Sequence, residues 1–241
     1  MDKQLRVYTK RNLKPSFFNG IFRKYSVTGW IIIINILVFV LALLSINFIG
    51  EGGAEKVFTF LGIQPILFFS GAVWTLITSM FMHVNFTHLF VNMISLFFIG
   101  SFIEKLVGRK RFFWLYMVSG LFAGLLFVFL AYFFGTSDLG ARIVGSPQTL
   151  AVGASGAIFA LGGLLAILTP KMRVYVMFVI PMQMWFAMVV LLGGFWLASI
   201  FGNLPVGNTA HFGGLLVGVA YGIYLRKKYP KKTAMLARSF S

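Results

Sequence analysis

The sequence predicts an all-α membrane protein whose chain crosses a lipid bilayer six times. Of its 241 residues, 59% are hydrophobic and only 11% are charged, whereas about a quarter of the residues in a soluble domain are charged. The mean hydropathy is +0.90. Uninterrupted apolar runs recur along the chain, and their length favours membrane-spanning helices over the strands of a barrel.

The predicted spans are separated by polar or broken segments. The first apolar run follows a basic arm but is too long for the apolar part of a signal peptide, so we interpret it as an uncleaved helix. Residues 51–83, broken by Pro65 and Gly71, are predicted to form an extracytoplasmic loop with short helices. The six predicted spans are 30–50, 84–104, 112–134, 153–169, 174–200 and 206–225.

The chain therefore divides into a basic arm (1–29), a six-helix membrane domain (30–225) and a basic tail (226–241). With six spans, all basic residues except Lys56 and Arg142 lie on the side of the two termini. The positive-inside rule then places both termini in the cytoplasm and predicts a multi-pass protein of the cell (plasma) membrane. This topology and contact with anionic membrane lipid explain the net charge of +16, so no nucleic-acid partner is expected.

Polar side chains inside a bilayer are costly and usually functional. The predicted spans contain few of them, and four lie toward the same leaflet: His88, Asn92, Ser155 and His211. Counting from His88, Ser155 or His211 to the basic residue at the cytoplasmic edge of its span gives about 22–26 Å at ~1.5 Å per residue. In a hydrocarbon core of about 30 Å, these groups lie several Å below the outer surface. Their common depth favours one shared site.

Ser155 lies in the stretch Gly153-Ala154-Ser155-Gly156, at the predicted start of a helix. A serine between small residues at a helix start has the layout of a nucleophile with a backbone N–H beside it, although small residues also serve helix packing. One face of the span 206–225 carries His211 and three glycines, and one face of the span 153–169 begins at Ser155. Close packing of these faces would bring Ser155 and His211 within hydrogen-bonding reach. The two faces consist of His211, Gly214, Gly218 and Gly222, and of Ser155, Phe159, Gly162 and Ala166.

This arrangement predicts a catalytic dyad. His211 would act as general base on Ser155 and then as acid toward the leaving amine, and no carboxylate lies at that depth to complete a triad. Phe159 would stack on the imidazole, while His88, Asn92 and the Ser155 N–H would donate to the oxyanion.

A zinc site is the other chemistry that three histidines suggest. The spacing His83-x4-His88 differs from H-E-x-x-H, and no acid lies nearby. We therefore expect no metal and no cofactor. The chain has no cysteine, so thiolate chemistry is excluded as well.

Taken together, these motifs resemble those of the rhomboid intramembrane serine proteases in their minimal six-helix prokaryotic form. The similar stretches are His83-x4-His88-x3-Asn92, Glu104-x3-Gly108, Gly153-Ala154-Ser155-Gly156 and Ala210-His211-x-x-Gly214, and the resemblance covers about residues 30–225. It implies that Ser155 is the nucleophile, that His211 is the base and that His83 is structural. It also implies cleavage of the transmembrane segments of single-span or other membrane proteins near the extracytoplasmic side, usually after a small residue.

Two positions depart from the pattern of the resembled family, and three other functions remain open. Many members have Trp-Arg where this chain has Trp74-Thr75, and many have Tyr where it has Phe159. The main alternative is a catalytically inactive rhomboid-like protein that binds transmembrane helices; the intact set of polar residues argues against it. A channel or transporter is disfavoured because the polar groups lie in one leaflet only. The third alternative is a lipid hydrolase.

Overall fold

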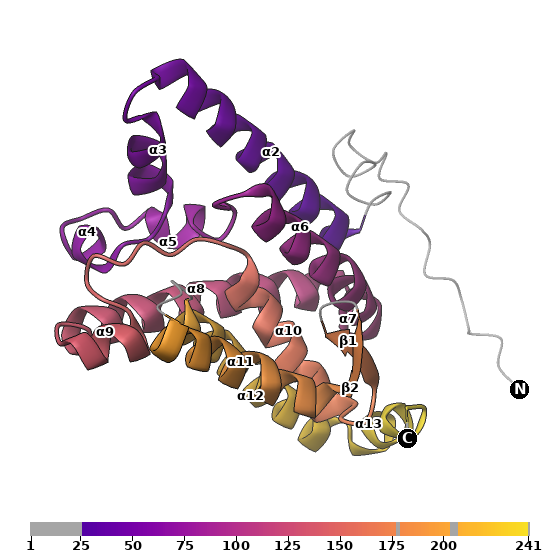
Figure 1. The fold of residues 1–241 in the computed structure, drawn as a ribbon. Helices are drawn as coiled ribbons and strands as arrows, with labels where there is room; N and C mark the ends of the chain where they lie inside the picture. Colours follow the sequence, from indigo (N-terminus) through magenta and orange to yellow (C-terminus); the bar gives the residue numbers. More distant parts are fainter. Residues whose placement is uncertain (1–25, 177–178, 203–206, 241) are drawn as a thin grey trace, which may run out of the picture.

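Four long helical segments form the frame of the molecule (Figure 1). The structure is a computed structural model, and it describes residues 26–176, 179–202 and 207–240. Most of the predicted basic arm 1–29 therefore lies outside the described residues. Among those residues, four segments are long and apolar enough to cross a membrane: α2 (Val27–Ile49), the segment Phe86–Val107, α8 (Arg109–Phe134) and α11 (Met184–Gly202). The first three correspond to the predicted spans 30–50, 84–104 and 112–134 and begin and end within three residues of them.

The segment Phe86–Val107 is not a uniform α-helix. It consists of α6 (Phe86–Ser95), a π-helical turn η1 (Leu96–Gly100) and α7 (Ser101–Val107). A π turn is a wider turn inserted into an α-helix, and it is frequent at functional sites. Here it separates the part of the segment that carries His88 and Asn92 from the part that carries Glu104.

α10 (Ser155–Leu168) is the central helix, and it packs chiefly against α12 (Asn208–Lys228) and α8. Ten of its 14 residues are buried. At about 1.5 Å per residue α10 is ~21 Å long, which is shorter than a hydrocarbon core of about 30 Å. Its N-terminal end can therefore lie below the membrane surface. α10 and α12 occupy the predicted spans 153–169 and 206–225 but are not among the four long spans, so six spans and cytoplasmic termini remain predictions.

Glycines let α10 and α12 pack with their backbones in contact. A Cβ atom on Gly214 would overlap the carbonyl oxygen of Gly156, and one on Gly218 would overlap that of Ala160. The predicted glycine face of α12 is thus its contact surface with α10. The predicted face of α10 was wrong in part, because Gly162 lies against Met188 of α11. Small residues occupy two neighbouring faces of α10, and their spacing alone does not decide which one meets α12. The α12 glycines lie against Gly156, Ala160 and Ile167 of α10, and a Cβ atom added to Gly163 would crowd the backbone of α12.

The predicted span 174–200 requires a correction. Its first part is a β-hairpin in which β1 (Arg173–Val176) pairs antiparallel with β2 (Ile180–Gln183), and α11 begins only at Met184. Proline cannot donate a backbone hydrogen bond and disfavours helix at the residue before it, and Pro181 lies inside β2. β-Branched residues around it favour strands. The apolar run is nearly continuous in hydropathy, but its proline and β-branched residues favour a strand before the helix.

The predicted loop 51–83 contains three short helices, as expected: α3 (Gly53–Leu61), α4 (Pro65–Phe69) and α5 (Thr75–Thr78). The departure at Trp74-Thr75 leaves the loop anchored, because Trp74 Nε1 donates to the Phe60 carbonyl at 2.9 Å. Thr75 is fully buried. The short helix α9 (Asp138–Val144) follows α8.

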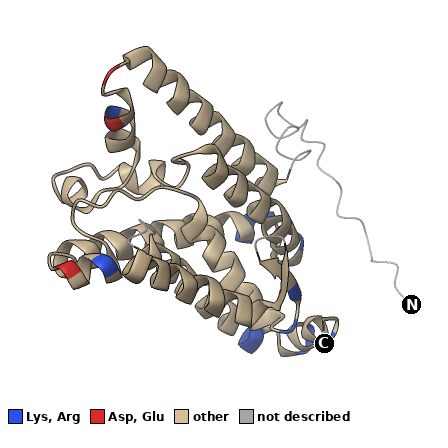
Figure 2. Ribbon diagram, viewed as in Figure 1, with Lys and Arg blue, Asp and Glu red and all other residues tan. Residues whose placement is uncertain are grey.

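The predicted basic tail 226–241 is mostly helical. Its first residues complete α12, and the helix α13 (Pro230–Arg238) follows and packs on α12 and α10. Figure 2 shows that, among the residues that the structure describes, the basic ones gather at this end of the bundle, apart from Lys56 on α3 and Arg142 on α9. The acidic residues on and beside α3 and at the start of α9 lie at the opposite end.

Candidate active site

The structure joins Ser155 and His211 by a hydrogen bond. The Ser155 Oγ and His211 Nε2 atoms are 2.8 Å apart, although the residues are 56 positions apart in the chain. Ser155 is the first residue of α10, and His211 lies in the first turn of α12. The close packing of these two helices therefore sets the distance between the two side chains.

The segment before α10 is held in an unusual conformation by the loop 51–83. Gly153 has a φ of +122°, a region that favours glycine. The Gly153 N–H donates to the Ser79 carbonyl at 2.8 Å. Two residues earlier, Ala151 forms an antiparallel β-bridge with Ile63 of the loop, in which each backbone N–H donates to the other's carbonyl. A Cβ atom on Gly153 would lie 2.9 Å from the His88 ring, so glycine is needed both for the turn and for the close approach of His88.

The turn leaves the backbone N–H groups at the start of α10 available. The first N–H groups of an α-helix have no partner inside the helix, and that of Ser155 lies beside its own hydroxyl. Together with the positive end of the helix dipole, this favours negative charge next to Ser155.

His211 is held between aromatic rings. It is 8% exposed, and its imidazole stacks on Phe159 with a centroid distance of 4.4 Å and an interplanar angle of 15°. The predicted stacking is thus present without a phenol hydroxyl. Phe195 of α11 contacts the imidazole as well, at 5.5 Å and 45°. For Nε2 to accept from Ser155, as a general base must, the neutral ring has to carry its proton on Nδ1. Nδ1 has no hydrogen-bond partner among the described residues.

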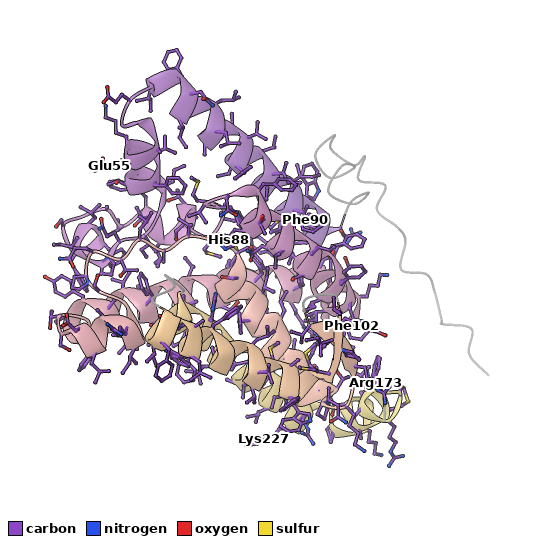
Figure 3. All side chains as sticks on the ribbon, viewed as in Figure 1. Glu55, His88, Phe90, Phe102, Arg173 and Lys227 are labelled. Carbon is purple, nitrogen blue, oxygen red and sulfur yellow. The ribbon has the colours of Figure 1, made fainter. Side chains whose placement is uncertain are left out.

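His88 and Asn92 lie on α6, facing the dyad across one cavity. The side chain of Asn85 caps α6 by accepting from the His88 N–H at 2.8 Å. Asn92 is 5% exposed and donates one amide hydrogen to the His88 carbonyl at 2.8 Å. An amide has two such hydrogens, so one remains for another acceptor. Figure 3 shows His88 in the middle of the molecule, far from Lys227 at the end of α12.

His83 packs behind His88 rather than joining the dyad. It lies between α5 and α6, is 1% exposed, and contacts the His88 ring edge-on at a centroid distance of 5.0 Å. Burial, with a smaller contribution from His88, lowers the pKa of His83 to about 4. The ring is therefore neutral near pH 7, which suits the structural role that the resemblance implies.

The polar side chains face a largely apolar cavity of about 500 Å³. Its lining includes Ser155, His211, His88 and Asn92, so the structure brings the four predicted polar residues together. The remaining lining is mostly apolar and comes from the segment 149–154, from α10 and from α6, α8, α11 and the β-hairpin. Such a cavity fits an extended apolar segment whose backbone carbonyl can approach Ser155.

Glu104 serves the frame and not the dyad. It accepts hydrogen bonds from the backbone N–H groups of Val27 and Thr28, both at 2.8 Å, and its carboxylate lies 3.6 Å from Arg109 Nε. It thereby provides acceptors for N–H groups of the first turn of α2 that have no partner inside the helix. Gly108, with a φ of +87°, turns the chain from α7 into α8.

Sequence reasoning missed two parts of the site. Phe195 lies in a uniformly apolar run, and nothing in its spacing distinguished it from lipid-facing neighbours. The helix α9 was not predicted, yet its last turn accepts hydrogen bonds that position α11 and α12. The Val144 carbonyl accepts from Thr209 Oγ1 at 2.9 Å, next to His211, and the Ile143 carbonyl accepts from Trp196 Nε1 at 2.8 Å.

Comparison with known proteins yields a family model and several relatives. A model of the Rhomboid domain matches residues 70–228. The chain is similar to RHOMBOID-like protein 12, mitochondrial, of Arabidopsis thaliana, with 34% identity over 164 residues, or 66% of this chain and 48% of that protein. It is also similar to Rhomboid protein 1, mitochondrial, of Saccharomyces cerevisiae, with 34% identity over 169 residues, or 66% and 43% of the two chains. Rhomboid protease GluP of Bacillus subtilis is 30% identical over 204 residues, or 84% and 34%. The chain thus spans about half the length, or less, of these relatives.

Proposed function

Because this chain belongs to the rhomboid family, a family of multi-pass membrane proteins, we propose that it is an intramembrane serine endopeptidase that cuts transmembrane segments with Ser155 and His211. The observation that carries the proposal is the 2.8 Å hydrogen bond between Ser155 Oγ and His211 Nε2 beside an apolar cavity. A nucleophile within hydrogen-bonding reach of its base is the arrangement that acyl transfer requires.

The reaction begins when the Ser155 oxygen attacks the carbonyl carbon of the scissile peptide. His211 Nε2 takes the hydroxyl proton as the new C–O bond forms, and the carbonyl oxygen becomes an oxyanion. His211 then gives that proton to the leaving amine as the C–N bond breaks. Water, deprotonated by the same imidazole, hydrolyses the acyl-enzyme and restores Ser155.

Two features support the imidazole in this cycle. Phe159 and Phe195 pack against the ring and hold it in place, whereas other serine hydrolases orient the imidazole with a carboxylate hydrogen-bonded to Nδ1. The negative charge of the oxyanion would be stabilised by the Ser155 N–H, the remaining Asn92 amide hydrogen and His88. One such donor is typically worth about 10²–10³ in rate.

The substrate class follows from the cavity. Its apolar lining accepts a segment of a single-span or other transmembrane protein rather than a soluble peptide. The α10 helix is too short to span the bilayer by itself, which supports cleavage below the extracytoplasmic surface. Two of the relatives named above are mitochondrial, and the cell membrane remains our predicted location.

The test is cleavage of a purified single-span substrate by the purified protein in lipid vesicles. We expect the wild type to cut, and Ser155→Ala and His211→Ala each to lose activity by on the order of 10⁴-fold or more, with the double variant little worse, because the two groups act as one unit. Product from Ser155→Ala at the wild-type rate would overturn the assignment. A wild type that binds the substrate without cutting it would instead favour an inactive rhomboid-like protein.

A further inference from the structure

A cluster of tyrosines and lysines lies at the end of α12 that is far from Ser155. Lys228 Nζ donates to the Tyr224 hydroxyl at 2.6 Å and lies 5.2 Å from the Tyr224 ring centre. It also lies 5.8 Å from the Tyr229 ring, and Lys232 lies 6.0 Å from the same ring. Tyr221 stacks on Tyr224 at a centroid distance of 6.0 Å. The Lys228 and Lys232 side chains are exposed, and each ammonium group lies over a tyrosine ring.

The cluster is positively charged, and no acidic side chain of the described residues balances it. Arg111, in the first turn of α8, is close enough to interact electrostatically with Tyr221 and Lys228. Glu104 is occupied by the α2 N-terminus and Arg109, and the other described acids lie at the opposite end of the bundle (Figure 2). Like charges held together repel, so an anion bound among them would stabilise the folded protein.

The fold holds the cluster in position. α13, which carries Lys232, is attached at its start by the Thr233 hydroxyl, which donates to the Tyr229 carbonyl at 3.0 Å. Leu236 packs against the main core, and Phe240 contacts Phe102 of α7 edge-on at 5.9 Å. α13 therefore closes back onto the bundle, and Lys232 stays beside the Tyr229 ring that Lys228 also contacts.

The position of the cluster identifies the kind of anion. The apolar part of α12 ends at Leu225, where the basic residues begin, so this is where the helix leaves the hydrocarbon. Tyrosine is enriched at the level of the lipid headgroups, because its ring is apolar and its hydroxyl is polar. The anion nearest to such a site is the phosphate of a lipid headgroup.

We propose that Lys228, Lys232 and Arg111, framed by Tyr221, Tyr224 and Tyr229, form a binding site for the headgroup of an anionic phospholipid. The two lysines and the arginine contact the headgroup phosphate, and the tyrosine rings line the site at the membrane interface. The site lies at the end of α12 opposite His211 and does not depend on the proposed protease activity.

The experiment measures the thermal unfolding midpoint of the full-length protein in lipid nanodiscs. The nanodiscs contain phosphatidylcholine with rising fractions of phosphatidylglycerol. We expect phosphatidylglycerol to raise the midpoint of the wild type. The double variant Lys228→Gln/Lys232→Gln should need a much higher fraction of phosphatidylglycerol for the same rise in the midpoint. We expect this fraction to increase about fivefold for each lysine lost, or roughly 25-fold for the pair.

The matched control is Lys227→Gln/Lys231→Gln, which removes the same charge from the same segment. Among the described residues, neither of these two lysines forms a hydrogen bond or a cation–π contact with the tyrosines. The control should respond to phosphatidylglycerol as the wild type does. An equal loss in both double variants would overturn the proposal in favour of general attraction between a basic surface and an anionic membrane. Inorganic phosphate added to pure phosphatidylcholine nanodiscs should leave the midpoint unchanged; a rise equal to that with phosphatidylglycerol would overturn the lipid as ligand.

Discussion

At the scale of single residues, replacing Asn92 tests whether its side chain donates to the oxyanion or only stabilises its helix. Asn92→Ala removes a hydrogen bond to the His88 carbonyl, worth about 1 kcal/mol of folding free energy, and also a proposed donor to the transition state. We expect kcat to fall by about 10²-fold, the low end for one oxyanion donor because others remain. Measuring kcat and the unfolding midpoint on the same preparations tests this.

Asn35 in α2 supplies the control for Asn92. It is fully buried, and its amide donates to the Ile31 carbonyl at 2.7 Å, four residues earlier, as Asn92 does to His88. Asn35→Ala should therefore cost similar stability and leave kcat near that of the wild type. If both variants lose stability alike and neither loses turnover, Asn92 serves only to hold its helix.

His83 makes stability depend on pH. Its folded-state pKa of about 4 lies below the ordinary value of 6.5, so between these values the unfolded chain binds a proton that the folded protein does not. The free energy of unfolding should therefore fall as the pH drops through this window, by up to about 3 kcal/mol for a shift of this size.

Replacing His83 isolates this contribution. His83→Phe keeps a ring in the buried position and removes the titration, so its unfolding free energy should fall less between neutral pH and about pH 4. Chemical unfolding in detergent across this range would measure the difference. Parallel pH curves for the wild type and the variant would contradict the burial of a neutral His83.

At the scale of elements, the contact between α10 and α12 determines the distance from Ser155 to His211. A Cβ atom on Gly218 would overlap the Ala160 carbonyl oxygen, and backbone cannot move aside as a side chain can. Even Gly218→Ala should push the two helices apart. Overpacking of this kind costs about 1–3 kcal/mol, and a displacement of about 1 Å in a catalytic pair can reduce the rate roughly 100-fold.

The comparison variant is Gly193→Ala in α11, where an added Cβ atom meets nothing within 4 Å. Cleavage rate and unfolding midpoint should be near the wild-type values for Gly193→Ala and reduced for Gly218→Ala. Wild-type cleavage by Gly218→Ala would mean that α10 and α12 do not need this close approach.

At the scale of the whole molecule, the charge distribution predicts which end faces the cytoplasm. Among the described residues, the basic end carries α13, and the opposite end, with α3 and α9, carries Glu51, Glu55 and Asp138. The natural chain has no cysteine, so single cysteines can report topology without background. Glu51→Cys should react with an impermeant thiol reagent on intact cells, whereas Ser239→Cys should react only after permeabilisation. The reverse pattern would contradict the predicted orientation.

The sequence by itself determined the membrane class, the helical composition and the identity of the four polar residues. These features follow from composition and from the cost of placing polar groups in hydrocarbon. The glycine spacing also predicted which face of α12 packs closely, since a helix repeats its faces every 3.6 residues.

Only the tertiary structure decided which face of α10 meets α12, where α11 begins, and that α9 and Phe195 support the site. On α10, small residues occupy two faces, and the choice between them depends on α8 and α11 packing at the same time. The hairpin at 173–183 interrupts an apolar run that hydropathy alone treats as continuous. Phe195 comes within reach of His211 only because α11 packs beside α10. Periodicity describes the faces of one helix, whereas the choice of neighbours depends on how all the helices fill space together.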